Sequence, residues 1–552
     1  MDNVTFLVCI LIIVGFWRLS RIGRRPKDCP LGPPTIPILG NIHLIPKHDV
    51  HLQFQKWAQE YGPVCSVMLG SKVLILLSSG NAIKDILDKR SSVSSDRMDL
   101  YMGQTLASGG LRVLMMIRRT LHRLLNINAA CSFEPYQVLE AQQMMYDILT
   151  EPTRFTEHIR RYANSITTTT TFGYEIWNYL STCTCSHRES KLKLVRYRVI
   201  TCEDPYFQEF FKVFGEFVLI AQTGVALILD YLPLLRLLPS WVLPLKRRAK
   251  THHEREKALY RYHWDKAKKI ILSSKPNPSF SIGLVDEQRK YRFSDDFASY
   301  ITGTLLEAGS DTTSNTLNGF ICAMLLFPDV QRRAQEELDR VVGSSRSPSP
   351  KDQGQLQYVR GCVKESLRWM PTTILGAIPH ALTQDEYYMG FRLPKGAGLL
   401  NNVYTIHGDA ARYPNPRQFD PQRYKDDDQS FFDAATNPDV SKRDHFSFGA
   451  GRRICPGMHV AERSLFLAIA KLLWAFEFRC PVDDEGIELV PDPTKVTQGF
   501  VCGPVPFEAV ITPRDTHRAA IIHREWNMAK ERNLDSRTMQ WKTFPGGIGT
   551  CT

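Results

Sequence analysis

Residues 448–457 of this chain read Phe-Gly-Ala-Gly-Arg-Arg-Ile-Cys-Pro-Gly, and they place one cysteine, Cys455, in a glycine-bracketed loop. Glycines allow the backbone to adopt positive φ and to fold tightly around the sulfur. No second cysteine or histidine stands at a spacing that would let it share a zinc ion with Cys455. The amide groups of such a loop, and the start of a following helix, stabilise negative charge. The segment therefore suits a single thiolate.

This loop resembles the haem-binding loop of the cytochrome P-450 family, whose pattern is F-G-x-G-x-R-x-C-x-G. Every fixed position is matched, by Phe448, Gly449, Gly451, Arg453, Cys455 and Gly457. The resemblance implies that Cys455 is the axial metal ligand to the iron of haem b and that Arg453 pairs with a carboxylate of the haem. Gly457 would leave room for a flat ligand, and the thiolate would favour O–O cleavage. The alternative interpretation is a turn before a buried helix, with an inert thiol.

The composition is that of a globular protein with a sizeable core. Of 552 residues, 43% are hydrophobic and 23% are charged. The 69 Lys and Arg exceed the 57 Asp and Glu, which gives a net charge of +12. Because no nucleic-acid-binding motif accompanies this excess, an acidic protein partner or an anionic membrane surface is expected, and no nucleic acid. The 13 cysteines lack paired spacing, which argues for a reducing compartment.

The N-terminus is typical of a membrane anchor. Residues 4–17 are apolar apart from Thr5, and a basic flank follows. The run is shorter than the ~20 residues of an ideal spanning helix. No small-residue cleavage site follows it, so a signal peptide is disfavoured. By the positive-inside rule we expect a single-pass protein of the endoplasmic reticulum membrane, with a transmembrane helix and flank in residues 1–29 and a cytosolic catalytic domain.

Helical periodicity dominates the rest of the chain. We expect helices over 205–229, 252–272, 297–326, 329–341 and 357–369, and strands over 64–68, 73–78, 387–393 and 399–404. Residues 30–514 then form one mainly α domain with small peripheral β-sheets. A tail follows over residues 515–552, and we expect it to be disordered from Asn533. The resemblance implies the family's helical prism, with haem between two long helices.

A second motif supports the resemblance. Glu365 and Arg368 lie three residues apart on one face of a predicted helix, and Arg423 follows in a Phe-x-Pro-x-Arg segment. An exposed pair at this spacing would contribute only a few tenths of a kcal/mol, about 0.2–0.5. By resemblance, Glu365 is instead held between both arginines in a buried network. Its role is structural support of the haem pocket.

A polar cluster interrupts the apolar helix predicted over residues 297–326. Residues 307–314 read Glu-Ala-Gly-Ser-Asp-Thr-Thr-Ser. In one interpretation, the threonines hydrogen-bond to carbonyls one turn back. The segment also resembles the family's A-G-x-D-T-T motif. This implies that Thr312 holds a water molecule and that Thr312 and Asp311 deliver the protons that O–O cleavage consumes.

Two further haem partners are implied by resemblance, His380 and Arg118. For His380 the alternative is a satisfied core or surface histidine. The sequence before Arg118 lacks the family's usual Tyr-Gly and tryptophan, which a deletion between Met116 and Ile117 would explain. We also expect residues 175–203 to be an insertion. It contains Cys183, Cys185 and His187, which lack a fourth zinc ligand at normal spacing.

The resemblance implies a haem-thiolate monooxygenase that inserts one oxygen atom from dioxygen into an apolar small molecule. Electrons would come from NADPH through NADPH cytochrome P-450 reductase, and the chain is similar to fungal members of secondary metabolite biosynthesis. The expected pocket walls are apolar and comprise residues 98–116, 207–222, 300–308, 373–378 and 499–503. Two alternatives stay open: a haem-thiolate isomerase or dehydratase, and an inactive haem-binding product of a damaged gene.

Overall fold

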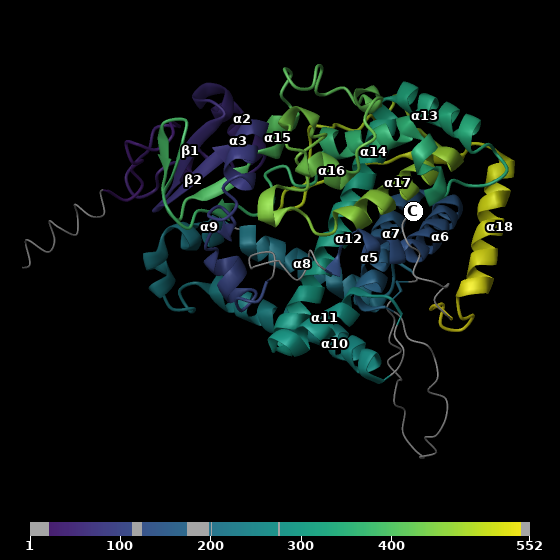
Figure 1. Ribbon diagram of the computed structural model, residues 1–552, viewed down its shortest axis with the longest axis horizontal. Helices are drawn as coiled ribbons and strands as arrows, with labels where there is room; N and C mark the ends of the chain where they lie inside the picture. Colours follow the sequence, from purple (N-terminus) through teal and green to yellow (C-terminus); the bar gives the residue numbers. More distant parts are fainter. Residues whose placement is uncertain are drawn as a thin grey trace, which may run out of the picture.

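The protein is mainly helical with small sheets, as predicted (Figure 1). Figure 1 shows the computed structural model, which describes residues 21–112, 124–173, 198–199, 201–222, 224–273 and 277–542. The hairpin of β1 and β2 lies at the left end of this view, and helix α18 lies at the right end.

The long helix α12, Asp295–Leu326, runs through the middle of the molecule (Figure 1). Its start is fixed by Ser294, whose side chain accepts a hydrogen bond from the N–H of Phe297. It packs most extensively against α7 (Phe155–Phe172) and α10 (Pro244–Ser273). Helix α12 is continuous through the polar cluster that the sequence analysis singled out, so this cluster lies on a rigid element.

The main hydrophobic core surrounds α17, Met458–Ala475. Residues 464–475 of this helix are all buried, as a helix that is apolar on all sides requires. Helices α6 (Glu134–Thr150), α13 (Pro328–Val341) and α14 (Gln357–Trp369) pack against it. Each large apolar side chain buried here contributes about 1.5–3 kcal/mol. The cysteine loop, which directly precedes α17, therefore rests on a rigid base.

A five-stranded sheet lies near the N-terminal end of the described chain. Its strands, in spatial order, are β1 (Val64–Leu69), β2 (Lys72–Leu77), β7 (Gly398–Asn401), β4 (His380–Ala381) and β3 (Asp96–Arg97). The β1–β2 hairpin is antiparallel, and β7 joins β2 in parallel. At the other edge, Arg97 pairs with His380. This pairing brings together two residues that are far apart in the chain.

Shorter elements complete the fold. The other helices are η1 (Ile42–Leu44), α2 (Val50–Tyr61), α3 (Gly80–Ile83), η2 (Lys84–Asp88), η3 (Tyr101–Leu106), α5 (Ile127–Ser132), η5 (Pro152–Arg154), α8 (Pro205–Gln222), α9 (Gly224–Tyr231), η6 (Pro233–Leu237), α11 (Phe280–Tyr291), η7 (Pro350–Gln355), α15 (Val403–His407), η8 (Pro421–Tyr424), α16 (Phe431–Thr436), η9 (Val440–Lys442), η10 (Gly451–Arg453) and α18 (Thr516–Asn533). Two separate antiparallel pairs are formed by β5 (Glu386–Tyr388) with β6 (Phe391–Leu393) and by β8 (Phe476–Arg479) with β9 (Val510–Pro513).

Three predicted elements differ in the structure. The helix predicted over 205–229 is two helices, α8 and α9. The strand predicted over 387–393 is the β5–β6 hairpin, which turns at Met389 and Gly390, both with positive φ. The strand predicted over 399–404 ends at Asn401, where α15 soon begins. In the β5–β6 hairpin, aromatic and apolar residues stand on both sides of the turn, so hydrophobic periodicity gives no sign of the break.

Helix α18 lies where the sequence predicted a tail. Its Ile521 and Ile522 belong to the main core, and Leu534 and Trp541 beyond it are buried. The expected disorder is therefore wrong for residues 534–542, while residues 543–552 lie outside the described chain. Helix α18 was not predicted because its few large apolar residues stand among many charged and polar ones.

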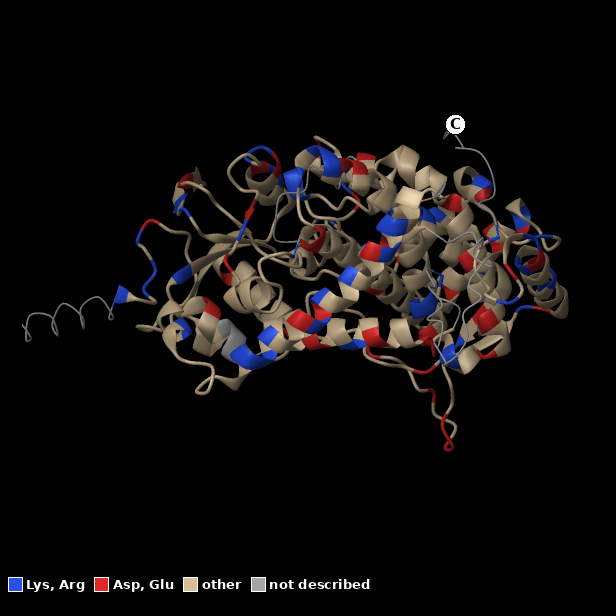
Figure 2. Ribbon diagram, turned by 90° about the horizontal axis from the view of Figure 1, so that it is seen from below, with Lys and Arg blue, Asp and Glu red and all other residues tan. Residues whose placement is uncertain are grey.

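Some predictions fall outside the described residues. These are the anchor at residues 4–17, Arg118 and most of the expected insertion at 175–203. Two residues near the end of that insertion, Arg198 and Val199, are buried in the protein. Among the helices in the described ranges, none combines the length and the apolar character needed to cross a bilayer. Figure 2 shows basic and acidic residues interspersed along the helices seen from that side.

Candidate active site around Cys455

The cysteine loop forms a compact turn before α17. The N–H of Cys455 donates a hydrogen bond to the carbonyl of Phe448 at 2.9 Å. Gly449 and Gly451 have left-handed φ angles of +73° and +62°, which fits the role that the sequence analysis gave them. Only glycine fits at position 451, because a Cβ there would lie 1.9 Å from the carbonyl oxygen of Leu87.

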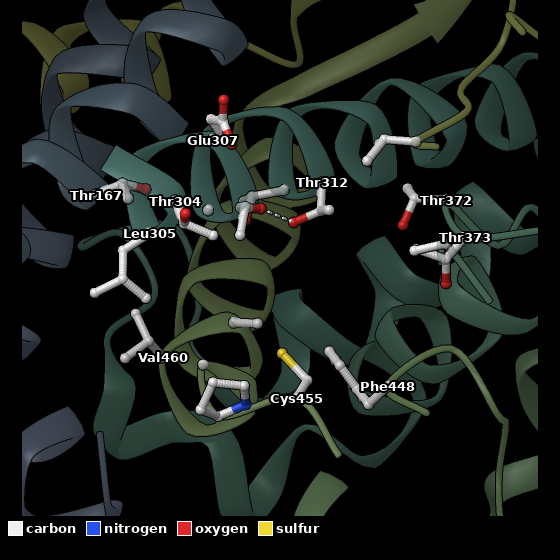
Figure 3. Close-up of a pocket in the computed structure, with 18 of the residues that line it drawn as sticks. Thr167, Thr304, Leu305, Glu307, Thr312, Thr372, Thr373, Phe448, Cys455 and Val460 are labelled. Atoms are coloured by element: carbon white, nitrogen blue, oxygen red, sulfur yellow. Dashed lines mark hydrogen bonds between the residues drawn. The ribbon is translucent and has the colours of Figure 1, made fainter. Parts of the chain in front are cut away.

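The sulfur of Cys455 faces a cavity of about 300 Å³ (Figure 3). Eight cysteines of the described chain carry free thiols and Cys131 is disulfide-bonded; of the eight, Cys455 alone lines this cavity. The residue is half-buried. A Cβ at position 457 would lie 4.0 Å from the Sγ of Cys455. Because Gly457 has no side chain, this space beside the sulfur stays open. A single accessible thiol thus forms part of the cavity floor.

All five predicted wall segments contribute to the cavity. Their lining residues are Arg112; Phe214 and Phe217; Thr304, Leu305, Glu307 and Ala308; Thr373, Gly376, Ala377 and Ile378; and Phe500 and Val501. Helix α7, which was not predicted as a wall, adds Ala163, Ile166 and Thr167. Most of these side chains are apolar or carry only a hydroxyl group, so the cavity suits an apolar ligand.

Helix α12 presents Ala308, Gly309 and Thr312 to the cavity. Figure 3 shows Thr312 on this helix, above Cys455. The hydroxyl of Thr312 donates a hydrogen bond to the carbonyl of Ala308 at 2.5 Å, which is the back-bonding that the sequence analysis considered. The same hydroxyl lies at the cavity surface, so its structural bond does not hide it from a ligand.

Asp311 does not lie with Thr312 at the cavity. It is absent from the lining, and its side chain lies in the field of Arg160 on α7. Burial raises the pKa of Asp311, although the positive charge of Arg160 and a hydrogen bond from Asn315 oppose the shift. The structure therefore brings Thr312, but not Asp311, to the predicted site.

Basic side chains gather at one edge of the cavity. Arg453 Nε donates to the carbonyl of Ser95 at 2.8 Å, and His380 Nδ1 lies 3.0 Å from the carbonyl oxygen of Ser94. Arg97, which the sequence analysis did not single out, pairs with His380 in the sheet and also lines the cavity. No local motif marks Arg97, because its position depends on pairing with a strand almost 300 residues away.

The structure also brings together Glu365, Arg368 and Arg423. Two nitrogens of Arg368 donate to the two carboxylate oxygens of Glu365, each at 2.7 Å, and Arg423 Nε donates to Glu365 at 3.3 Å. The hydroxyl of Tyr424 and the N–H of Asp420 donate to the same carboxylate. Glu365 and Arg368 are 0% and 1% exposed. This buried network joins α14 to the η8 segment that precedes the cysteine loop.

The residues present fit a haem. A lone thiol faces the cavity beside a glycine, and basic groups stand at one edge, where propionates would need them. Within the described ranges, no group of three or more His, Cys, Asp or Glu could hold a bare metal ion. The residues Cys183, Cys185 and His187 lie outside those ranges. One thiol beside basic side chains suits an iron whose other ligands come from a porphyrin.

Known structures share this fold. A zebra fish cytochrome P450 solved with progesterone superimposes with a TM-score of 0.65 at 21% sequence identity. The match covers 84% of this chain and 99% of that chain. At this identity the likeness concerns the fold alone.

Fungal relatives match almost the full length. The chain is 47% identical to cytochrome P450 monooxygenase virE of Hypocrea virens, over 97% of this chain and 94% of the relative. It is 43% identical to cytochrome P450 monooxygenase fogE of Aspergillus ruber, over 98% and 97%. It is 40% identical to cytochrome P450 monooxygenase fsoB of Humicola fuscoatra, over 97% and 96%. The profile of the cytochrome P450 family matches residues 30–509, and with the thiol of Cys455 facing α12 this shows that the chain belongs to the cytochrome P450 family.

Proposed function

We propose that the protein is a monooxygenase that inserts one oxygen atom from dioxygen into an apolar small molecule in a fungal secondary metabolite pathway. The observation that carries this proposal is the thiol of Cys455 facing an apolar cavity below Ala308, Gly309 and Thr312 of α12. The names of the relatives, all cytochrome P450 monooxygenases from fungi, support the reaction type.

Haem b would be held by Cys455 at its iron and by Arg97, His380 and Arg453 at its propionates. When bound, the haem supplies the redox chemistry that splits dioxygen, with electrons that we propose come from NADPH through NADPH cytochrome P-450 reductase. Cys455, as a thiolate, would donate electron density to that iron. The three basic side chains stand where charge-assisted hydrogen bonds to two carboxylates would fix the orientation of the ring.

The other lining residues position substrate and protons. Phe214, Phe217 and Phe500 exclude water and hold an apolar body by contact. We propose that Thr312 Oγ1 passes a proton from water into the cavity, because this hydroxyl lies at the surface of α12 that faces the site. Asp311 is the proposed acid that resupplies Thr312, and its raised pKa would keep a proton available nearer neutral pH.

The thiolate assignment is tested by spectroscopy on the reduced protein with carbon monoxide. We expect the red-shifted Soret band of a haem-thiolate centre, and we expect Cys455→Ser to abolish it. Incubation with reductase, NADPH and candidate metabolites tests the reaction. Product formed without NADPH would replace the proposal with the isomerase or dehydratase alternative, and the absence of the Soret band would refute the proposal.

The proton role is tested by coupling. In Thr312→Ala we expect less product for each NADPH consumed, while Thr312→Ser, which keeps the hydroxyl, should stay close to the native ratio. Product formation in Thr312→Ala that is as tightly coupled to NADPH as in the native protein would contradict this role.

We also propose that the protein lies on the endoplasmic reticulum membrane behind an N-terminal anchor. Exposed apolar side chains support this: Leu237 and Trp241 are 83% and 81% exposed, and Ile36 and Ile38 are 40% and 42% exposed. The chain near each group contacts the turn between β1 and β2. The N–H of Gly70 donates to the carbonyl of Leu39, and the N–H of Ser71 donates to the carbonyl of Tyr231. Loss of vesicle binding in Trp241→Ser combined with Leu237→Ser would support a membrane contact here.

A further inference from the structure

Two charged side chains that line the cavity have no role in the proposed haem site. Arg112 and Glu307 line the same cavity as Cys455, beside Phe214 and Phe217. Both are more than nine-tenths buried, at 2% and 5% exposed. Figure 3 shows Glu307 on the side of α12 that faces away from Cys455. A charged pair therefore stands in a mostly apolar cavity, away from the cysteine.

The pair belongs to a buried network with fixed geometry. Arg112 donates hydrogen bonds to Glu307 through Nη1 and to Glu256 through Nη2. Its Nε donates to Ser108 Oγ at 3.0 Å. The hydroxyl of Tyr260 donates to Glu307 Oε1 at 2.6 Å. These bonds hold the carboxylate of Glu307 in one orientation, as a recognition group requires.

Glu307 keeps acceptor capacity toward the cavity. An ionised carboxylate offers about four lone-pair sites, and among the described residues the side chain of Glu307 accepts bonds from Arg112 and Tyr260. Burial raises the pKa of Glu307, and the adjacent guanidinium of Arg112 opposes this shift and favours the ionised form. Arg112 is less available, because all three of its nitrogens already donate and its guanidinium carbon lies 3.5 Å from the ring centroid of Phe217. The group open to a ligand is therefore an acceptor.

The charges of the network disfavour an anionic ligand. One guanidinium, Arg112, faces two carboxylates, Glu307 and Glu256, and His252 Nε2 lies 3.3 Å from Glu256. A further anion in this low-dielectric place would be repelled by the two carboxylates. Apolar side chains of similar volume would stabilise the fold at least as well as a buried ion pair. Stability alone therefore does not account for a charged pair at the cavity wall, and its position suits ligand recognition.

We propose that Glu307, positioned by Arg112 and Tyr260, accepts a hydrogen bond from a hydroxyl group of the substrate. The enzyme would then select neutral alcohols or phenols with an apolar body. This inference rests on the proposed monooxygenase function, because it names the substrate class for the same cavity. The hydroxyl is anchored beside Glu307, and the apolar end of the molecule extends toward the side of α12 that faces Cys455.

The test compares three rigid probes on the full haem-loaded chain without NADPH: 1-naphthol, 1-methoxynaphthalene and 1-naphthoate. Dissociation constants are measured by calorimetry and by perturbation of the Soret band. We expect 1-naphthol to bind about tenfold or more tightly than its methyl ether, the usual effect of one hydrogen bond to a charged group. 1-Naphthoate should bind more weakly than 1-naphthol.

Glu307→Leu should bring the ratio between naphthol and its ether close to one. Glu307→Gln keeps the shape and leaves Arg112 paired with Glu256, so it should fold even where Glu307→Leu does not, and it should lower the ratio severalfold. The matched control is Glu256→Gln, which removes the same charge from the same network at a residue that is 0% exposed and does not line the cavity. It should retain the preference for naphthol.

A native ratio near one, or a ratio that Glu307→Gln and Glu307→Leu leave unchanged, would overturn the inference. Tightest binding of 1-naphthoate would overturn it as well, since Arg112 would then be the recognition group. These outcomes are distinct from failure of the proposed function, which shows as a missing haem-thiolate Soret band while probe binding can still be measured by calorimetry.

Discussion

The backbone N–H of Gly451 donates a hydrogen bond to Asp88 Oδ1 at 2.6 Å, across 363 residues of chain. The carboxylate of Asp88 also accepts a bond from Arg443 and lies 3.5 Å from Lys84 Nζ. The carbonyl of Leu87 lies directly against Gly451. The cysteine loop is thus fixed to helix η2 on one side as well as to α17 on the other.

This contact predicts different outcomes for two glycines with similar φ. Gly449→Ala places a side chain in left-handed backbone but in open space, since the nearest atom to its Cβ would be 3.8 Å away. We expect it to cost roughly 1–2 kcal/mol of stability. Gly451→Ala has the same strain and in addition a Cβ 1.9 Å from the Leu87 carbonyl oxygen, so it should cost a further ~3 kcal/mol or more.

Urea unfolding and haem content measure both variants. Gly449→Ala should still load haem, whereas Gly451→Ala should purify with little. Equal stability of the two variants would show that η2 moves away freely and that its contact with Gly451 does not stabilise the protein.

The network around Glu365 leads to a second comparison. Glu365→Ala leaves the guanidinium of Arg368 buried and without its carboxylate, and removing one partner of a buried pair costs about 3–5 kcal/mol. Arg423→Ala removes one longer bond to Glu365 and two exposed bonds to the carbonyls of Pro414 and Asn415, from a side chain that is 13% exposed. It leaves the Glu365–Arg368 pair intact. Its expected cost is about 1.5 kcal/mol. Thermal unfolding of the two variants measures the stability that each loses. A larger loss of stability in Arg423→Ala than in Glu365→Ala would contradict this prediction.

In helix α12, we expect the effect of Gly309→Ala on stability to change sign when Thr167 is also substituted. A Cβ at Gly309 would lie 2.5 Å from Oγ1 and 2.8 Å from Cγ2 of Thr167 on α7. We expect Gly309→Ala to destabilise the protein by about 1–3 kcal/mol. In a Thr167→Ala background both atoms are gone, so the helix propensity of alanine should make Gly309→Ala stabilising by up to about 1 kcal/mol.

A double-mutant cycle by urea unfolding measures this coupling. If Gly309→Ala costs the same in both backgrounds, the close packing of α7 on α12 is not the reason for a glycine at this position.

Local signals explain what could be predicted from the sequence. The long helices follow from periodicity, and the cysteine loop follows from glycines and a thiol within ten residues. The roles of Asp88, Arg97 and Arg112 depend on contacts between segments far apart in the chain, which no local pattern encodes. Glu307 shows the limit most clearly. It lies in a motif visible in the sequence, but its partner Arg112 is 195 residues away.

Some predicted strands are wrong because the backbone turns within them. The β5–β6 hairpin and the start of α15 interrupt stretches that read as single strands. Asp311 and Thr312 differ in position for another reason: adjacent helical residues point in directions about 100° apart, and of the two only Thr312 lines the cavity.

Asp230 joins α9 to η3, because its Oδ1 accepts a hydrogen bond from the N–H of Met102 in η3 at 3.0 Å. The side chain is 1% exposed. Burial raises the pKa of Asp230 to about 6, in spite of the opposing charges of Lys72 and Arg236. Between the unfolded pKa and pH 6, the folded protein therefore binds a proton that the unfolded chain has already released.

The sign of the pH effect follows from this excess of bound protons. Stability falls as pH rises from about 4 to 6, and the contribution of Asp230 is at most about 3 kcal/mol. Asp230→Asn keeps an acceptor for Met102 and cannot titrate, so its stability relative to the native protein should increase over the same interval and stay constant above pH 7. Urea unfolding of both proteins at pH 4.5 and pH 7 measures the difference. A native protein that gains stability over Asp230→Asn between these two pH values would mean that the carboxylate of Asp230 is stabilised, and not penalised, by its place in the fold.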